Sequence, residues 1–385
     1  MGKHVLIVGG GFAGISAGVA LLEGGRVDGV DLVERQSKPI VKTTGGFAQW
    51  WMRGRKFDVP TNAVAAHVNG VRIVSPSGYD AVVRSHESVA FVIHPQIFLE
   101  EYWRRFEALG GHIVTGATVQ HVDVDGNATY TTSSGVVVRG SYDAIVAADG
   151  VKSTVKRILG LPEPSDDDIH IGYEETHPNT PKYDHSLVHL YIHPQLAPKG
   201  YWWVFPDDDT GQNVRVGVGV PKSVGLSPKH QLSMIKERYG GFDGKPLKVV
   251  GGHIPTAKPP KTNVYGRILL VGDAGNFCSP LHGGGIGFSW LSGILASEAI
   301  SAGDLKSYDA KWRKTLAPLL ARHYTLKKIF YRWNTPQFDK AVNTISKMDI
   351  KVTPNTDPNI EIIHAVKNLI HVDPRLVLDL IRLKL

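Results

Sequence analysis

Three glycines near the N-terminus have the spacing of a loop that receives a phosphate group. Gly9, Gly11 and Gly14 form a GxGxxG pattern between a strand-like apolar run and a helix-like run. In this pattern the first glycine permits a tight turn, the second lets backbone approach a pyrophosphate, and the third lets the helix pack on the strand. Glu34 follows twenty residues after Gly14, and its carboxylate can accept both ribose hydroxyls of an adenosine. The spacing therefore predicts a dinucleotide site.

A second glycine-rich run, residues 266–300, resembles the second FAD motif of flavoproteins of the hydroxylase and geranylgeranyl reductase superfamily. By that resemblance Asp273, in a Gly-Asp-Ala sequence, binds a ribityl hydroxyl, while Pro280 and the glycines after it bring a helix N-terminus to the flavin pyrimidine. Backbone N–H groups and the positive end of a helix stabilise the negative charge that builds on a reduced flavin. Asp149-Gly150 resembles the Asp-Gly motif of the same superfamily. Together the motifs predict an FAD protein, because an NAD dehydrogenase explains only the first one.

The aromatic stretch at residues 197–206, APKGYWWVFP, carries the more specific resemblance. It contains PxxYxWxFP without a mismatch, which is a signature of the archaeal geranylgeranyl reductase family, and a Gly-x-Gly strand follows as in that family. Alternate residues of a strand point to opposite faces. We therefore expect Tyr201, Trp203 and Phe205 on one face and Trp202 on the other.

The resemblance implies that this aromatic face borders a long apolar cavity over the flavin, which suits an isoprenoid chain. Tyr201, Trp203 and Phe205 are then substrate-binding residues. Trp50 and Trp51 would form the other wall of the cavity, although packing in a core or a lid explains this pair equally well. An ordinary sheet face that packs on a core is the alternative for the whole stretch.

The resemblance covers about residues 1 to 310, and two departures from the family pattern matter. Many reductases of the family carry Cys-Gly in the loop after the first βαβ unit, whereas here Thr44 precedes Gly45-Gly46. Many superfamily members begin the helix near residue 95 with an arginine, whereas this chain has His94-Pro95-Gln96. The cofactor-binding residues implied by the motifs are Gly9, Gly11, Phe12, Ala13, Gly14, Glu34, Arg35, Gly45, Gly46, Asp149, Gly150, Gly272, Asp273, Pro280, Gly283, Gly284, Gly285 and Ile286.

Two residues of the second motif are candidates for proton transfer. His282 lies beside the glycine turn and can supply a proton near neutral pH, or it is a structural histidine. Cys278 lies between Asp273 and Pro280, or it is a buried small hydrophobic residue. The chain has no HExxH motif and no closely spaced His and carboxylate cluster, so we expect no metal.

The elements that must position these residues follow an α/β pattern. Residues 4–8 and 29–35 read as buried parallel strands around a small-residue helix, which is a βαβ unit. Short alternating runs in residues 60–93 and 165–255 read as half-buried antiparallel strands. From Leu305 onward the chain reads as helices separated by prolines.

The sequence therefore predicts a Rossmann-like FAD-binding domain with an inserted antiparallel β-sheet substrate domain and a C-terminal helical segment. We assign residues 1–60, 94–162 and 256–304 to the FAD-binding domain, 61–93 and 163–255 to the substrate domain, and 305–385 to the helical region.

Charge and composition limit the partners and the compartment. The formal net charge is +7, but acidic residues interleave with basic ones, and no basic stripe or RNA-binding signature predicts a nucleic-acid partner. A single cysteine fits a reducing cytosol, and we find neither a secretory signal nor an apolar span of bilayer length. Residues 359–385 form a basic amphipathic pattern that either lies in a lipid interface or docks on the body or a second subunit. We expect a cytoplasmic protein whose membrane contact, if it has one, is peripheral.

The resemblance implies an FAD-dependent reductase that saturates double bonds of a geranylgeranyl-type chain in a lipid or a quinone. Either NAD(P)H or a ferredoxin-like redox protein would supply the electrons. Two alternatives remain open at this point. An FAD-dependent monooxygenase or halogenase shares the FAD motifs, and a non-catalytic isoprenoid-binding flavoprotein would hold lipid without turnover.

Overall fold

The structure is a computed structural model that describes residues 3–40, 42–53, 57–178, 183–242 and 244–356. The chain divides into two compact units, each made of three separate segments. Unit 1 contains Met1–Val41, Pro95–Ser165 and Ile254–Ala321, and unit 2 contains Lys42–His94, Asp166–His253 and Arg322–Leu385. Residues 305–321 thus belong to unit 1, and the residues after them are assigned to unit 2. The separate C-terminal helical region expected at residues 305–385 stays a prediction.

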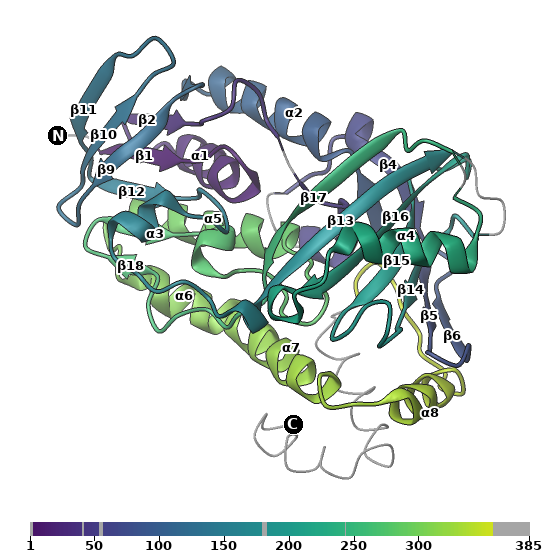
Figure 1. Cartoon of the computed structure of the whole chain (residues 1–385). Coiled ribbons are helices and arrows are strands. Elements are labelled where there is room, and N and C mark those ends of the chain that lie inside the picture. The colour runs from purple at the N-terminus through teal and green to yellow at the C-terminus, as the bar shows by residue number, and fades with distance from the viewer. Residues whose placement is uncertain (1–2, 41, 54–56, 179–182, 243, 357–385) are drawn as a thin grey trace. The chain divides into compact units, whose positions relative to one another are not determined.

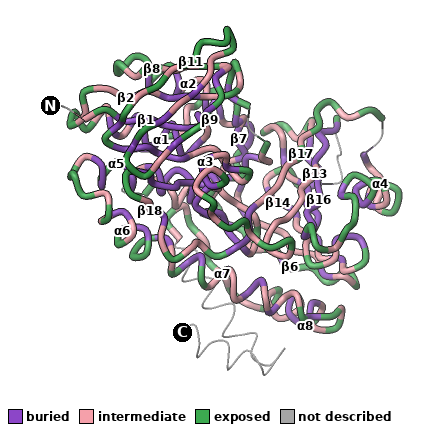
Figure 2. The backbone as a smooth tube through the Cα atoms, turned by 60° about the vertical axis from the view of Figure 1, so that its left-hand side comes forward, coloured by how far each residue is buried: buried purple, intermediate pink, exposed green. Residues whose placement is uncertain are grey.

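Unit 1 is built on a six-stranded sheet in the order β18-β19-β12-β1-β2-β8 (Figure 1). Five of its strands run parallel: β1 (His4–Val8), β2 (Gly29–Val33), β8 (His112–Val114), β12 (Ala144–Ala147) and β19 (Ile268–Leu270). The short β18 (Val264–Tyr265) closes one edge antiparallel to β19. The strand β1 lies among the buried segments in Figure 2. Every residue of β12 is also buried, as the continuous apolar runs of both strands predict for a parallel sheet covered on both faces.

Three helices of unit 1 pack together: α1 (Phe12–Gly24), α2 (Pro95–Ala108) and α5 (Ile286–Ala302). The helices α1 and α5 approach closely because Gly293 of α5 faces the backbone of α1, where a Cβ atom would lie 2.3 Å from the Ala13 carbonyl oxygen. Ser16 of α1 also donates its hydroxyl to the Trp290 carbonyl at 3.0 Å. The small residues of both helices therefore fix the two glycine motifs side by side.

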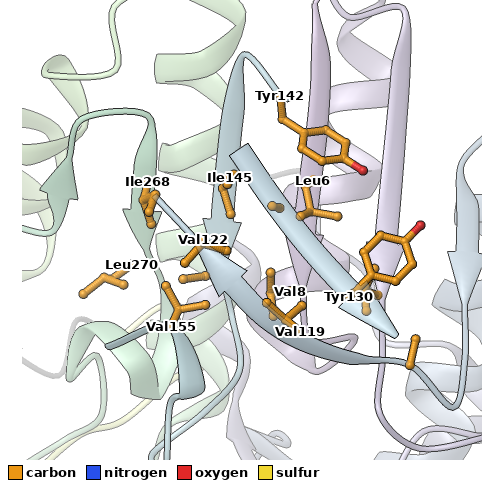
Figure 3. Packing of buried hydrophobic residues seen from close by; sticks show 14 residues of the cluster. Leu6, Val8, Val119, Val122, Tyr130, Tyr142, Ile145, Val155, Ile268 and Leu270 are labelled. Carbon is orange, nitrogen blue, oxygen red and sulfur yellow. The ribbon is translucent and has the colours of Figure 1, made fainter. Parts of the chain in front are cut away.

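A three-stranded sheet, β11-β10-β9, packs on the side of β1 that carries Leu6 and Val8 (Figure 3). Its antiparallel strands are β9 (Thr118–Val122), β10 (Asn127–Thr131) and β11 (Val137–Ser141). Leu6 and Val8 of β1 contribute to this cluster together with Val119 and Val122. The short α3 (Thr154–Ile158) and α6 (Ser307–Thr315) complete the helices that lie wholly within the described part of unit 1.

Unit 2 is built on a seven-stranded sheet in the order β17-β13-β16-β15-β14-β5-β6. Its strands are β5 (Gly70–Val74), β6 (Asp80–Arg84), β13 (Ile169–Pro178), β14 (Leu187–Tyr191), β15 (Tyr201–Pro206), β16 (Asn213–Pro221) and β17 (Lys248–Pro255). β5 and β14 pair parallel, in contrast to the antiparallel pairing expected throughout this region. The alternating residue pattern reports which face is buried, and it is the same for both strand directions, so it could not reveal this pair.

Helix α4 (Pro228–Tyr239) covers one face of this sheet, and Ser227 caps its N-terminus by accepting the His230 N–H at 3.4 Å. A smaller sheet in the same unit has the order β3-β7-β4, with β3 (Gly46–Ala48), β4 (Val64–Val68) and β7 (Ala90–Ile93). Helices α7 (Ala317–Phe330) and α8 (Thr335–Ile345) follow at the C-terminal end.

The basic amphipathic pattern at residues 359–385 lies outside the described residues. In the part of the chain that the structure describes, every helix is too short or too polar to cross a bilayer.

Candidate cofactor and substrate sites

The three glycines of the first motif have the separate geometric tasks that their spacing predicts. Gly9 has φ +101°, and a Cβ atom there would lie 2.5 Å from the Ala148 carbonyl oxygen. A Cβ atom at Gly14 would lie 1.9 Å from the Gly9 carbonyl oxygen, so only glycine lets α1 approach the strand. At Gly11 a Cβ atom would meet no described residue within 4 Å. The loop is therefore tight where it touches protein and open at Gly11, where a pyrophosphate would approach.

Glu34 and a tryptophan of α2 hold this loop in place. Glu34 follows β2, and its two carboxylate oxygens accept the N–H groups of Gly10 and Gln36, each at 2.9 Å. Trp103 donates its indole N–H to the Gly10 carbonyl at 2.8 Å. Each carboxylate oxygen has a second lone pair, so Glu34 can still accept a ribose hydroxyl. The role of Trp103 was missed, because no local pattern links it to the glycines.

The second motif packs directly against the first. Gly272 has φ +56°, and a Cβ atom there would lie 2.7 Å from the Ala13 side chain in the first turn of α1. Phe12 and Ala13 are buried in that turn, while Arg35 is exposed after β2. The contact between Ala13 and Gly272 thus brings together residues that are 259 positions apart in the chain, as a cofactor site built from both motifs requires.

Asp273 is a half-buried carboxylate beside the start of α5. It accepts no hydrogen bond from the described residues, and burial raises the pKa of its carboxyl group to about 6. A Cβ atom at Gly285 would lie 3.6 Å from Asp273 Oδ1 and 3.4 Å from Cys278 Sγ. Gly285 precedes Ile286, the first residue of α5, and no described side chain caps that helix terminus. The carboxylate and the helix N-terminus are therefore both available to a polar ligand.

The two proton-transfer candidates of this motif are poor proton donors at neutral pH. Cys278 is buried, its thiol donates to the Gly283 carbonyl at 3.2 Å, and burial raises its pKa well above the ordinary value. His282 is exposed, and its Nδ1 accepts the Gly284 N–H at 3.2 Å, which requires an unprotonated nitrogen. The surrounding protein also lowers the pKa of this imidazole. The nearby Pro280 is buried and shapes the turn.

Asp149 has a structural partner that the Asp-Gly resemblance did not indicate. Its carboxylate accepts the Ser153 hydroxyl at 2.6 Å and the Val155 N–H at 3.0 Å, at the start of α3. Burial raises the pKa of this carboxyl group. Gly150 follows with φ +80°, and a Cβ atom there would meet no described residue within 4 Å. The Asp149 side chain thus orders the turn, while the Gly150 backbone stays accessible.

In unit 2 the alternation expected along β15 is confirmed. Trp202 has no exposed surface and stacks on Tyr191 with ring centroids 3.7 Å apart, in the core covered by α4. The rings of Tyr201 and Trp203 lie 5.7 Å apart on the other face. Phe205, on the same face, packs against a separate cluster formed by β4 and β7.

The Gly-x-Gly pattern of β16 makes room for Trp203. Gly217 is the register partner of Trp203, and Gly219 is the partner of Tyr201. A Cβ atom at Gly217 would lie 2.4 Å from Cζ2 of the Trp203 indole, so the ring lies flat against this position. A Cβ atom at Gly219 would lie at an ordinary 3.5 Å from the same ring. Trp203 therefore packs directly on Gly217, where a larger residue would displace the ring.

Glu174 lies in cross-strand register with Gly217 and Trp203, and the sequence analysis did not identify it. It lies on β13 as the other register partner of Gly217, and its Oε2 accepts the Trp203 indole N–H at 2.8 Å. The Thr44 hydroxyl donates to the same oxygen at 2.6 Å. Burial raises the pKa of the Glu174 carboxyl group. Only the cross-strand register reveals this residue, because its neighbours are distant in the chain.

The loop at Gly45-Gly46 is tightly packed within unit 2. Gly45 has φ +87°, and a Cβ atom there would lie 2.5 Å from the Ile93 carbonyl oxygen. A Cβ atom at Gly46 would lie 2.7 Å from Cε1 of Phe205. The buried Arg215 donates from Nη1 to the carbonyls of Thr44 and Ile93. Packing within unit 2 therefore accounts for both glycines, and a flavin contact there stays a prediction.

Trp50 and Trp51 form a half-buried edge-to-face pair with ring centroids 4.9 Å apart, in the 3-10 helix Gln49–Met52. Their role as a second cavity wall stays a prediction. No group of three or more His, Cys, Asp or Glu residues that could hold a metal ion occurs within the described ranges.

Sequence comparisons connect the chain to one set of enzymes. A family model described as the geranylgeranyl reductase catalytic domain matches residues 168–254, which contain β13, β15 and β16. The digeranylgeranylglycerophospholipid reductase of Methanoculleus marisnigri is 27% identical, over 99% of this chain and 98% of that protein. The chloroplastic geranylgeranyl diphosphate reductase of Oryza sativa subsp. japonica is 31% identical, over 86% of this chain and 76% of that protein.

Solved structures confirm the α/β fold class. A geranylgeranyl bacteriochlorophyll reductase-like protein from Thermoplasma acidophilum matches with a TM-score of 0.88 at 22% identity, over 99% of both chains. A flavin-dependent brominase matches with a TM-score of 0.67 at 17% identity, over 95% of this chain and 98% of that one. At these identities the likeness shows a shared fold, and the fold hosts more than one chemistry.

Proposed function

The chain belongs to the geranylgeranyl reductase family, and we propose on this basis that it is an FAD-dependent oxidoreductase that saturates double bonds of a polyprenyl chain in a lipid or a quinone. Family membership supplies the reaction class. The observation that supports the site within this chain is the aromatic face of β15, where Tyr201 and Trp203 lie together and Trp203 covers Gly217.

The residues of unit 1 fit FAD. The open backbone at Gly11 suits the pyrophosphate, and Glu34 suits the adenosine ribose. The half-buried Asp273 lacks a described hydrogen-bond donor and would accept one from a ribityl hydroxyl, while the N–H groups at Ile286 would face the pyrimidine. When bound, FAD supplies the hydride that reduces a double bond. Gly283, Gly284 and Gly150 would add backbone contacts, as the motifs imply.

The residues of unit 2 would bind the prenyl chain. Tyr201, Trp203 and Phe205 offer an apolar face, and each buried methylene of the chain contributes about 0.8 kcal/mol. Trp50 and Trp51 would extend this surface. An isolated double bond lacks an activating group, so the enzyme must fix its position and exclude water. Rigid aromatic rings on a buried strand are suited to that task.

The proposal also covers the electron donor and the place where the protein acts. FAD takes the single dinucleotide fingerprint of the sequence, so NAD(P)H would bind transiently, or a ferredoxin-like protein would deliver electrons. Prenyl lipids reside in membranes, and we propose that this protein works in the cytoplasm with peripheral membrane contact.

The test is anaerobic reaction of the reduced holoprotein with a geranylgeranyl lipid. We expect the dithionite-reduced flavin to reoxidise and the lipid to gain pairs of hydrogens without oxygen. A strict need for oxygen, with an oxygen or halogen atom in the product, would instead identify a monooxygenase or halogenase. Tight lipid binding without flavin reoxidation would identify a non-catalytic isoprenoid-binding protein.

A further inference from the structure

Glu174 is a buried carboxyl group without a counter-ion. Its side chain belongs to a residue that is 5% exposed, and both of its described hydrogen bonds end on one oxygen, Oε2. Among the described residues no Lys, Arg or His nitrogen lies within 4.0 Å of this carboxylate. A buried unpaired charge is costly, and such a carboxyl group takes up a proton instead. Burial therefore favours the protonated form of Glu174 and raises the pKa of its carboxyl group.

Two charged groups face Glu174, and they are paired with each other. Arg215 from β16 donates from Nε to Asp207, in the turn after β15, at 2.5 Å. Arg215 lowers the pKa of Glu174 and Asp207 raises it, while loss of solvent is the largest influence and raises it. Asp207 thus offsets part of the positive charge of Arg215 near Glu174, and the guanidinium is positioned to stabilise the Glu174 carboxylate once the proton has left.

We propose that Glu174 is the proton source for the double-bond reduction and that the Thr44 hydroxyl relays its proton to the substrate. This inference rests on the proposed function. Thr44 Oγ1 and Trp203 Nε1 meet at the same Glu174 oxygen, which places the Thr44 hydroxyl at the edge of the aromatic face. A neutral Glu174 can donate its O–H to Thr44 across the same 2.6 Å, which releases the Thr44 hydrogen for an outside acceptor.

The step balances as a two-electron reduction. The π bond of the alkene breaks, and one of its carbons forms a C–H bond with a hydride from the reduced flavin, which becomes oxidised. The neighbouring carbon forms a C–H bond with the proton of the Thr44 hydroxyl. Thr44 recovers a proton from Glu174, and the resulting carboxylate recovers its own from solvent.

Glu174 differs from the two residues that the sequence suggested for this task. The Cys278 thiol has a pKa raised well above its ordinary value, and the His282 ring is neutral with a lowered pKa. Neither holds a readily transferred proton at neutral pH. A neutral carboxyl group does, and it is hydrogen-bonded to the proposed substrate surface.

The test compares single-turnover flavin reoxidation by a geranylgeranyl lipid across a pH series. We expect Glu174→Gln to slow it by about 100-fold or more, because general acids contribute roughly 10²–10⁴-fold. The wild-type rate should fall as pH rises through the Glu174 pKa, since the acid is active only when protonated, and the Glu174→Gln rate should not follow that titration. Thr44→Val should slow the reaction similarly, and Thr44→Ser, which keeps a hydroxyl, should restore it.

Glu175→Gln is the matched control. Glu175 is adjacent on β13, and its carboxylate pairs with Lys236 at 2.7 Å and His177 at 2.8 Å. Its neighbours lie on the opposite face, so this variant should keep the wild-type pH profile even if it is less stable. All variants are compared at equal FAD content.

A second readout is independent of turnover. The infrared spectrum of the protein without lipid should contain the carbonyl band of a neutral carboxyl group that is sensitive to D₂O and lost in Glu174→Gln but not in Glu175→Gln. A reactive wild type with an equally reactive Glu174→Gln would overturn this inference alone. A wild type that reacts with no prenyl substrate would overturn the proposed function and the inference with it.

Discussion

The two units carry their sites in different ways. In unit 1 the residues around Gly9, Gly11 and Gly14 lie in one short loop, and each glycine has a task that its position in the motif defines. In unit 2 the row Glu174, Gly217 and Trp203 is assembled from three strands by cross-strand register. A local motif is recognisable from a few neighbouring residues. Residues that lie side by side on different strands cannot be identified until the strand pairing is known.

The difference also appears in the electrostatics. Asp273 in unit 1 is a carboxyl group with a pKa of about 6, so it is largely ionised at neutral pH and suited to accept a hydrogen bond. Glu174 in unit 2 is more deeply enclosed, and burial raises the pKa of its carboxyl group. In the proposed function the two carboxyl groups would have opposite tasks, Asp273 as a hydrogen-bond acceptor and Glu174 as an acid.

The largest expected effect separates the two faces of β15. Trp202→Ala should lower the free energy of unfolding by about 3–5 kcal/mol, because the buried ring leaves a cavity against Tyr191. Trp203→Ala should slow flavin reoxidation by about 100-fold, because a displaced substrate loses its alignment. Thermal unfolding and single-turnover reoxidation measure the two effects. If Trp203→Ala reduced only stability, the aromatic face would be scaffold.

A second pair tests the cofactor loop of unit 1. Gly14→Ala should lower the free energy of unfolding by about 3 kcal/mol, because its Cβ would clash with the Gly9 carbonyl at 1.9 Å. Gly11→Ala meets no described residue within 4 Å and should fold normally but bind FAD more weakly. Denaturant unfolding and FAD titration distinguish the variants. Normal FAD affinity in Gly11→Ala would contradict a pyrophosphate at this position.

A third pair tests the packing of Trp203 on β16. Gly217→Ala should cost about 1–3 kcal/mol of stability and slow flavin reoxidation, because its Cβ would push the indole away from Glu174. Gly219→Ala places its Cβ at an ordinary 3.5 Å from the ring and should change little. Equal behaviour of the two variants would show that the indole is not held at Gly217. Thermal unfolding and single-turnover flavin reoxidation measure the two effects.

The smallest effect concerns the pH dependence of FAD binding. Asp273 should accept a ribityl hydroxyl only when ionised, so FAD affinity should fall as pH falls through about 6. Asp273→Ala should lose about 1–3 kcal/mol of binding free energy at neutral pH. Asp273→Asn should remove the pH step, which a fluorescence titration of FAD at several pH values would detect. A step that persists in Asp273→Asn would assign it to another group.

The sequence by itself determined the βαβ unit, the packing tasks of Gly9 and Gly14 and the two faces of β15. These properties depend on residues close together in the chain, where the helical and strand periods and the spacing of glycines act directly. The resemblance also implied that both glycine motifs bind one FAD, and the structure packs Ala13 of the first motif on Gly272 of the second.

Only the tertiary structure revealed Trp103 under the glycine loop, the parallel pairing of β5 with β14, and Glu174 beside Trp203 and Thr44. Strand register and direction are set by how whole sheets pack, and a single residue pattern is compatible with several pairings. The pKa of a carboxyl group depends on the atoms that surround it, whatever their position in the chain. For this reason Glu174, which no local pattern distinguishes from its neighbour Glu175, acquires its chemistry from the fold.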